Sequence, residues 1–392
     1  MDDADVTSGR AWQDFCARLA AVGARILEED FPADPADRAE GYRHLATQVA
    51  CWLTYAAGYA DPARPAFFRS SDPVFLWGGP NVDQVARRAP ITGDGVFRVS
   101  GAMGACEEFV LQVKTGATQS GGADIATELS ASSLGLGPGD SFEITFGGEE
   151  RSGHWYPLPE DASFVHVRDY YFDWRPREPA TFVIERLDTQ GTPAPRVTAT
   201  RVAAMLDDAA HEVEHSMVFW KDYQVRMRET YPVGAMGAPV YMGRGVRDIM
   251  YSHGFVSLAD DEAMVVTLDP ADADLWDVQL YNRTWYEGLD FTTRVTSLNH
   301  RQVFCGSDGL VRIVISGTDP GVPNWLDNEG RTEVLATVRW MRPPADPTVR
   351  SEIVAGDALA DVLPADTPTV GPVERAAERA SRAAHSAWRY RS

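Results

Sequence analysis

Lysine is almost missing from this 392-residue chain, which holds only Lys114 and Lys221 among its 36 basic side chains. A phosphate-binding Walker loop needs a Gly-Lys-Ser/Thr sequence, and neither lysine has that context. A Schiff-base enzyme needs a lysine nucleophile, and Lys221 falls in a stretch with helical periodicity. The sequence therefore argues against kinase, P-loop and pyridoxal chemistry.

Cysteine and long apolar runs are also scarce. The four cysteines are widely scattered without a C-x-x-C pair, which argues against a zinc ribbon, a thioredoxin-like motif or a disulfide scaffold. No run approaches the roughly 18 apolar residues of a membrane span. The acidic N-terminus is not followed by the apolar stretch of a signal peptide. We therefore expect a cytoplasmic protein without a membrane partner.

Acidic side chains dominate the charge, with 57 acidic against 36 basic residues and a net charge of −21. Such a surface repels phosphate backbones and anionic lipids, so nucleic acid is not an expected partner. An apolar fraction of 44% is typical of a globular protein, and the length allows two or three domains.

Hydrophobic periodicity divides the chain into five parts. Residues 11–30, 36–60 and 200–228 have helical spacing, and the tail from residue 372 has the composition of a helix. From about residue 90, alternating apolar residues separated by Gly- and Pro-rich turns predict strands at 96–99, 109–113, 142–146, 164–167, 181–184, 251–258, 263–268, 276–281, 311–315 and 333–340. We expect an all-β fold with added helices, built from two tandem jelly-roll-like antiparallel β-sandwiches. The predicted parts are a helical segment (1–65), a first sandwich (66–195), a connecting helix (196–232), a second sandwich (233–345) and a tail with a helix (346–392).

The two β-rich halves share a weak internal repeat. At an offset of 167 residues, FVLQVK at 109–114 aligns with WDVQLY at 276–281, which places Gln112 over Gln279. Further along, Trp155 matches Trp325 at an offset of 170, as a loop insertion would produce. The pattern predicts two copies of one unit, and a tryptophan present in both copies indicates a structural role.

These segments also resemble a known bacterial family. The second half carries WDVQLY at 276–281, SLN at 297–299, DG at 308–309, DPG at 319–321, NWL at 324–326 and VR at 338–339. That order resembles the family catalogued as domain of unknown function twelve-fourteen. The first half, with GYRHL at 41–45 and WGGPN at 77–81, resembles the twelve-fifty-four-like region that usually precedes it. The resemblance covers about residues 36–343, is specific over 276–340, and implies a two-sandwich homo-oligomer. No established catalytic residue exists to be transferred.

The sharpest literal motif is HEVEH at residues 211–215. On a helix, His211 and His215 lie one turn apart and can bind Zn²⁺, while Glu212 can act as a base on a bound water. The helical wheel favours a different interpretation, because both histidines fall opposite the apolar stripe, beside aspartates. No third ligand has a familiar spacing, so we expect a solvated face and retain zinc as the alternative.

A second candidate site lies in the segment 281–300. If residues 276–281 and 294–300 form neighbouring strands, the loop between them closes one end of the sandwich with aromatic and polar side chains. His300 is the natural acid–base group, Tyr281 and Arg294 can stabilise an oxyanion, and Asn299 belongs to the same cluster. His253, on the preceding strand, is a further candidate. The competing interpretation is a polar rim around an aromatic core.

The sequence favours a protein that binds a small apolar or amphipathic metabolite in the second sandwich. Any transformation would use acid–base chemistry without a cofactor. Two alternatives remain open: a zinc-dependent hydrolase using the HEVEH helix, and a noncatalytic oligomeric binding or scaffold protein.

Overall fold

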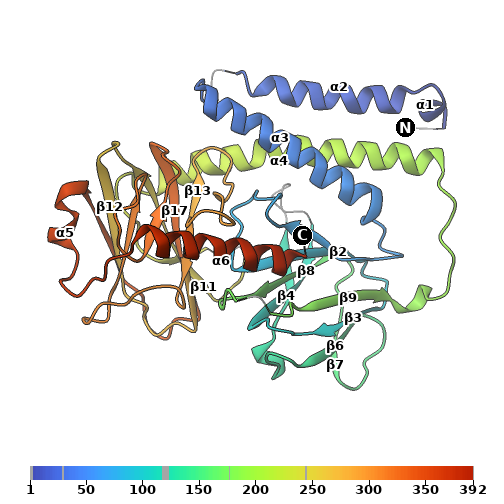
Figure 1. Ribbon diagram of the computed structural model, residues 1–392. Helices are drawn as coiled ribbons and strands as arrows, with labels where there is room; N and C mark the ends of the chain where they lie inside the picture. The colour runs from blue at the N-terminus through green and yellow to red at the C-terminus, as the bar shows by residue number, and fades with distance from the viewer. Residues whose placement is uncertain (1–2, 29–30, 117–122, 176, 243–244, 392) are drawn as a thin grey trace. The chain divides into compact units, whose positions relative to one another are not determined.

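A computed structural model describes residues 3–28, 31–116, 123–175, 177–242 and 245–391 (Figure 1). The chain divides into two compact units. Unit 1 comprises Met1–Phe75, Gln84–Tyr170 and Glu178–Trp220, and unit 2 comprises Leu76–Asp83, Tyr171–Arg177 and Lys221–Ser392. Each unit contains a pair of β-sheets with helices added, which confirms the predicted fold of two tandem sandwiches.

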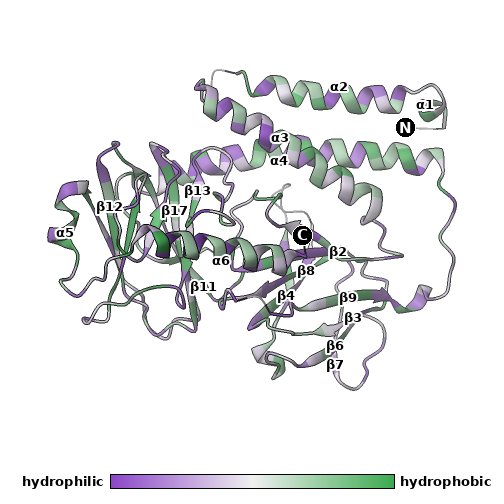
Figure 2. Ribbon diagram, viewed as in Figure 1, coloured by the Kyte–Doolittle hydropathy of each residue, from purple (hydrophilic) through white to green (hydrophobic). Residues whose placement is uncertain are grey.

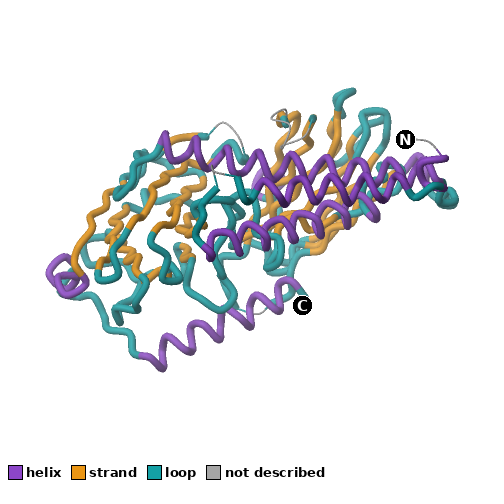
Figure 3. Tube along the Cα trace, turned by 90° about the horizontal axis from the view of Figure 1, so that it is seen from above, coloured by secondary structure: helices purple, strands orange, loops and turns teal. Residues whose placement is uncertain are grey.

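Unit 1 begins with helices. These are α1 (Asp3–Thr7), α2 (Arg10–Arg25), α3 (Pro35–Gly58) and the first part of α4 (Ala199–Thr230). Asp34 caps α3, since its Oδ1 accepts the Ala36 N–H at 2.8 Å. Phe15 and Leu206 belong to a buried cluster that packs α2 against α4. Figure 3 separates the helices, in purple, from the strands, in orange.

The described residues of unit 1 form a sandwich of nine strands in two sheets. Phe109, Phe142 and Phe182 pack between the sheets, with ring centroids 5.2–5.6 Å apart. One sheet has the order β1-β2-β8-β4-β5 and the other β7-β6-β3-β9. The strands are β1 (Phe68–Ser71), β2 (Gln84–Pro90), β3 (Phe97–Ala102), β4 (Glu108–Thr115), β5 (Asp124–Ser130), β6 (Ser141–Phe146), β7 (His154–Tyr156), β8 (Ala162–Tyr170) and β9 (Thr181–Arg186).

Within the described part of unit 2, nine strands form a second sandwich. Its sheets have the orders β10-β11-β17-β13-β14 and β16-β15-β12-β18. One buried apolar cluster with members from both sheets, including Val266, Val278 and Ile313, forms the core. The strands are β10 (Val240–Tyr241), β11 (Ile249–Ser257), β12 (Glu262–Leu268), β13 (Leu275–Asn282), β14 (Ser297–Asn299), β15 (Val311–Ser316), β16 (Trp325–Asp327), β17 (Glu333–Met341) and β18 (Val349–Ala355).

The strand order of unit 1 is repeated in unit 2, with each strand number increased by nine. Cross-strand pairing is also the same: Val110 pairs with Arg168 where Asp277 pairs with Arg339. Even the parallel pairs β6–β7 and β15–β16 recur. The segments that align in sequence therefore occupy the same strands.

Past residue 345 the chain is still part of unit 2. Strand β18 pairs with β12 over seven residues, so the second sandwich extends beyond the predicted boundary. A short helix α5 (Leu359–Val362) and a long helix α6 (Pro372–Tyr390) follow. Figure 2 shows hydrophilic and hydrophobic residues mixed along α6. Among the helices of the described ranges, none has both the length and the apolarity to cross a bilayer.

Candidate functional site

Two buried aspartates organise the polar centre of unit 2. Asp277, on β13, accepts from Nη1 of Arg339 at 2.9 Å and from Nδ2 of Asn81 at 2.7 Å. The backbone N–H of Asp83 donates to Oδ1 of Asn81 at 2.8 Å. The segment before β2 is thereby fixed to the sheet by side-chain amides and carboxylates, and both aspartates are buried.

The two carboxylate oxygens of Asp83 differ in their hydrogen bonds. Its Oδ1 accepts the indole N–H of Trp174 and an amide N–H of Asn299, each at 2.6 Å, while its buried Oδ2 has no partner among the described residues. Burial and the nearby Asp277 raise the pKa of Asp83 to about 7, against the opposing effect of Asn299 and Arg389. Burial also raises the pKa of Asp277. A carboxyl with a pKa near neutrality can both donate and accept protons at physiological pH.

Helix α6 presents arginines to the interior of unit 2. Arg382 and Arg389 are each only 3% exposed. Arg382 donates to the Phe291 carbonyl at 3.2 Å and to Oγ of Ser297 at 2.7 Å, and Arg389 donates to the Val82 carbonyl at 2.7 Å. Neither guanidinium reaches a carboxylate of the described chain within 4.0 Å. Nη1 of Arg382, and Nε and Nη2 of Arg389, have no hydrogen-bond partner there.

Trp174 contacts both Asp83 and helix α6. The guanidinium carbons of Arg382 and Arg389 lie 4.4 Å and 4.9 Å from the centroid of its ring. The imidazole of His385 stacks on the same indole at 5.0 Å. Burial and Arg389 lower the pKa of His385 to about 3, so this imidazole is neutral. We call the group Asp83, Trp174, Asn299, Arg382, His385 and Arg389 the Trp174 site.

Two of the residues predicted from the sequence belong to the polar centre of unit 2. Asn299 is a member of the Trp174 site. Tyr281 donates its hydroxyl hydrogen to the Pro80 carbonyl at 2.8 Å and accepts a hydrogen bond from Nη2 of Arg339. Burial raises the pKa of Tyr281, which keeps the phenol protonated. The predicted pairing of the strand before the loop with the strand after it is also present, since β13 pairs with β14.

The two predicted histidines lie beside the centre without reaching Asp83. His300 packs its ring on Phe172 with centroids 5.0 Å apart, and its backbone N–H donates to the Trp276 carbonyl. His253 places Nδ1 at 2.9 Å from Oγ1 of Thr337. Burial lowers the pKa of His253 to about 3, so it stays neutral at physiological pH.

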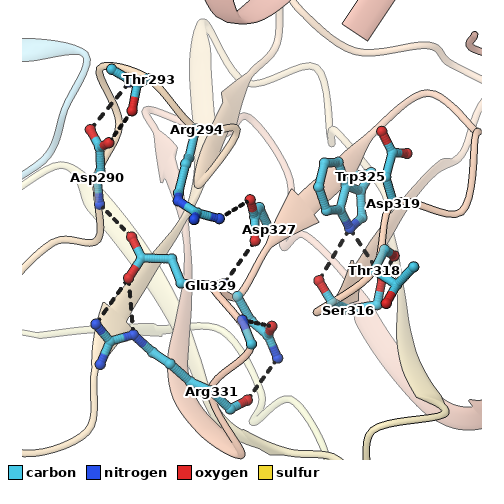
Figure 4. A network of polar contacts seen from close by, with 12 residues as sticks. Asp290, Thr293, Arg294, Ser316, Thr318, Asp319, Trp325, Asp327, Glu329 and Arg331 are labelled. Carbon is cyan, nitrogen blue, oxygen red and sulfur yellow. Dashed lines mark hydrogen bonds and ion pairs between the residues drawn. The ribbon is translucent and has the colours of Figure 1, made fainter. Parts of the chain in front are cut away.

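Arg294 belongs to a separate network in the loops of unit 2 (Figure 4). Its Nη1 lies 2.7 Å from Oδ2 of Asp327, and the arginine side chain is 47% exposed. The same network links the backbone N–H of Asp290 to Glu329, which also pairs with Arg331. Trp325 donates its indole N–H to the Ser316 carbonyl nearby, just as Trp155 donates to Gly147 in unit 1. These contacts stabilise the loops, and the guanidinium of Arg294 is already paired with the carboxylate of Asp327.

The HEVEH segment lies on α4 in unit 1. His211 and His215 are exposed, their ring centroids are 3.9 Å apart, and Nδ1 of His215 lies 2.8 Å from the His211 carbonyl. Glu212 is on the more buried side of the helix, and Glu214 pairs with Arg18. Within the ranges that the structure describes, no group of three or more His, Cys, Asp or Glu side chains is placed to hold a metal ion.

The sequence pattern did not indicate that α6 and Asp83 are parts of a site. One signal was present: Arg375, Arg382 and Arg389 recur every seven residues, which places them on one face of a helix. In an isolated helix such a face is expected to meet water. Its burial depends on the loop carbonyls and on Trp174, which come from distant parts of the chain.

Comparison with solved structures identifies a close relative. A crystal structure of an uncharacterised protein from Burkholderia cenocepacia superposes with a TM-score of 0.83 at 32% identity, and the match covers 91% of this chain and 100% of that one. The chain belongs to the family of that protein. The VPA0106 protein from Vibrio parahaemolyticus matches at 11% identity and a TM-score of 0.46, over 79% of this chain and 97% of that one, too low to support an argument. No family model and no curated protein matches the chain.

Proposed function

We propose that unit 2 binds a small organic anion at the Trp174 site, with the anionic group held by Arg382 and Arg389. The observation that carries this proposal is the burial of two guanidiniums without a carboxylate at ion-pair distance in the described chain. An unpaired buried charge is unfavourable by several kcal/mol in order of magnitude. A bound carboxylate would offset that penalty, because guanidinium and carboxylate groups form strong paired hydrogen bonds.

The surrounding aromatic rings favour an amphipathic ligand. Phe291 lies edge-on to Trp174 at 6.2 Å and packs against Tyr390 at 6.3 Å. Aromatic walls with a few polar groups are typical of small-molecule sites. The proposed ligand class is therefore an organic acid with an apolar body, which refines the apolar or amphipathic metabolite expected from the sequence.

Asp83 is the group that we propose transfers a proton. Its Oδ2 is buried without a hydrogen-bond partner among the described residues, its pKa is about 7, and the charge of Arg389 acts on it. His300, the acid–base candidate from the sequence, packs on Phe172 instead. Acid–base chemistry at this site would use Asp83 on a ligand whose anionic group is fixed by α6.

Four further predictions from the sequence accompany this proposal. We propose that the two sandwiches are copies of one ancestral unit, supported by their shared strand order. The resemblance to domain of unknown function twelve-fourteen, the homo-oligomeric state and the cytoplasmic location also stay predictions.

The test is calorimetric titration of the intact protein with benzoate, octanoate and acetate. We expect benzoate or octanoate to bind more tightly than acetate, and Arg382→Gln/Arg389→Gln to weaken binding by about ten-fold or more. Arg391→Gln is the matched control, because it removes an exposed charge just after the same helix. Equal binding by the double variant, or equal loss in the control, would contradict the proposal.

A further inference from the structure

A second group of basic side chains lies in unit 1, on the outer face of the sheet β1-β2-β8-β4-β5. His166 on β8 has Arg88 of β2 as its cross-strand neighbour on one side and Gln112 of β4 on the other. These three residues form one row across three strands. Lys114 and Arg168 lie two residues from Gln112 and His166 on their strands, so they share this face. We call Arg88, Lys114, His166 and Arg168 the basic face; β2, β4 and β8 are labelled in Figure 1.

These charges have few partners. No carboxylate of the described chain lies at ion-pair distance from Arg88 or from the buried Lys114, and no described group forms a hydrogen bond with either side chain. Arg168 donates to Oε1 of Gln112 at 2.8 Å, and Gln112 in turn donates to Glu128. Burial lowers the pKa of Lys114 to about 8, with Arg168 and Arg88 acting in the same direction and Glu128 and Asp124 against it.

Helix α3 covers part of the basic face with aromatic rings. The guanidinium carbon of Arg88 lies 5.4 Å from the ring centroid of Trp52 and 4.8 Å from that of Tyr55. Arg88, His166 and Arg168 keep partial solvent exposure, so the face is reachable. Glu212 of α4 also interacts with Arg88, and burial raises the pKa of Glu212 against the opposing effect of this arginine.

The second sandwich provides an internal comparison. Arg339 occupies the strand position that Arg168 occupies in unit 1, and it forms an ion pair with Asp277. In unit 1 the residue opposite Arg168 is Val110. The arginine at this position therefore forms an ion pair in unit 2, whereas in unit 1 no carboxylate of the described residues lies at ion-pair distance from it.

We propose that the basic face binds a doubly charged oxyanion, namely a phosphate group. Two guanidiniums and one ammonium lie along this row, and no carboxylate of the described residues lies at ion-pair distance from any of them, while Glu128 and Asp124 act on Lys114 from farther away. Arginine guanidinium groups, which donate paired hydrogen bonds, and lysine ammonium groups are typical phosphate-binding groups in proteins. The site lies in unit 1 and is separate from the Trp174 site, so it adds a second ligand to the protein.

The test is titration of the intact chain with inorganic phosphate and with glycerol phosphate. Arg382→Gln/Arg389→Gln serves as the background, so that the Trp174 site does not contribute. We expect Arg88→Gln/Arg168→Gln to weaken phosphate binding by about ten-fold or more, and Val110→Asp to weaken it by supplying a carboxylate opposite Arg168. Preference for glycerol phosphate would indicate a phosphorylated metabolite, and equal affinity would indicate recognition of the phosphate group alone.

Arg98→Gln is the control, because Arg98 lies on β3 of the other sheet and pairs with Glu185. Phosphate binding that is absent, that survives the double variant, or that falls equally in the control would overturn the proposal. A second measurement needs no variant of the basic face. Phosphate should protect Lys114, but not Lys221, from trinitrobenzenesulfonate, and mass spectrometry can read both because they are the only lysines. A Lys114 that reacts without phosphate and reacts equally in its presence would also overturn it.

Discussion

The indole N–H of Trp174 donates to Oδ1 of Asp83 at 2.6 Å, while the face of the same ring carries the guanidinium of Arg382 at 4.4 Å. One side chain thus holds a carboxyl at its edge and a cation on its face. The edge of an aromatic ring is positive and its face negative, so both contacts are favourable. This arrangement separates the carboxyl from the guanidinium, and the buried Oδ2 of Asp83 has no hydrogen-bond partner among the described residues.

Replacing a buried arginine of the Trp174 site should stabilise the ligand-free protein. Arg389→Met removes a charge that has no carboxylate partner, so we expect the free energy of unfolding to rise by about 1 kcal/mol. Thermal denaturation without added anions measures this. Arg339→Met is the comparison, since Arg339 is paired with Asp277 and its loss should destabilise. A clear loss of stability in Arg389→Met would show that this guanidinium serves the fold.

The carboxyl of Asp83 should make stability depend on pH. Its pKa rises from 3.8 to about 7 on folding, so the folded state holds a proton that the unfolded chain releases. This contribution is present below about pH 4 and is lost as the pH rises through 7. Asp83→Asn should therefore match the wild type near pH 4 and be more stable at pH 8, by roughly 1 kcal/mol or more.

Denaturation midpoints of both proteins between pH 4 and pH 8 test this difference. Buried His253 and His385 have lowered pKa values, which act in the opposite direction, but they are common to both proteins and cancel in the comparison. A constant difference across the range would mean that Asp83 ionises normally in the folded protein.

Asp277 should be essential for the stability of unit 2. Asp277→Asn leaves the buried guanidinium of Arg339 beside a neutral amide, and breaking a buried pair in this way costs about 3 kcal/mol. Asp274→Asn is the matched control, because Asp274 is 57% exposed in its pair with Arg342. Chemical denaturation should show a large loss in the first variant and a small one in the second. Equal effects would assign the stability of this region to other contacts.

The HEVEH helix can be tested with His211→Ala/His215→Ala. Both imidazoles are exposed, so we expect the free energy of unfolding to change by less than about 0.5 kcal/mol. We also expect the same metal content as in wild-type protein purified without chelators or an affinity tag. One zinc per chain that disappears in the variant would support the hydrolase alternative.

The sandwiches could be predicted because their strands alternate in apolar residues. Leu111, Val113, Val278 and Leu280 point into the cores, and the period of two is visible directly in the sequence. Strand β2 was missed because it contains Arg87 and Arg88 in succession. Each is accommodated by a distant group: Arg87 pairs with Asp169, and Arg88 lies under the aromatic rings of α3.

The candidate site was only partly predictable. The sequence indicated Tyr281 and Asn299 from their place beside an aromatic loop, and both belong to the buried polar centre of unit 2. It favoured His300 because histidine has the usual pKa for acid–base work. Burial makes Asp83 the better acid–base candidate, because it raises the pKa of Asp83 and lowers the pKa of other histidines. Burial of a side chain depends on which segments cover it, and the local sequence does not contain that information.

Local patterning thus determined the two sandwiches, the helices and their order, because periodicity and turn residues act over a few neighbours. Only the tertiary structure determined which charged side chains are buried away from solvent. It placed Asp83 against Trp174, buried the arginines of α6, and paired Arg339 while leaving Arg168 without a carboxylate. Electrostatic free energies depend on distance and solvation in three dimensions, so chemistry at these sites is set by residues far apart in the chain.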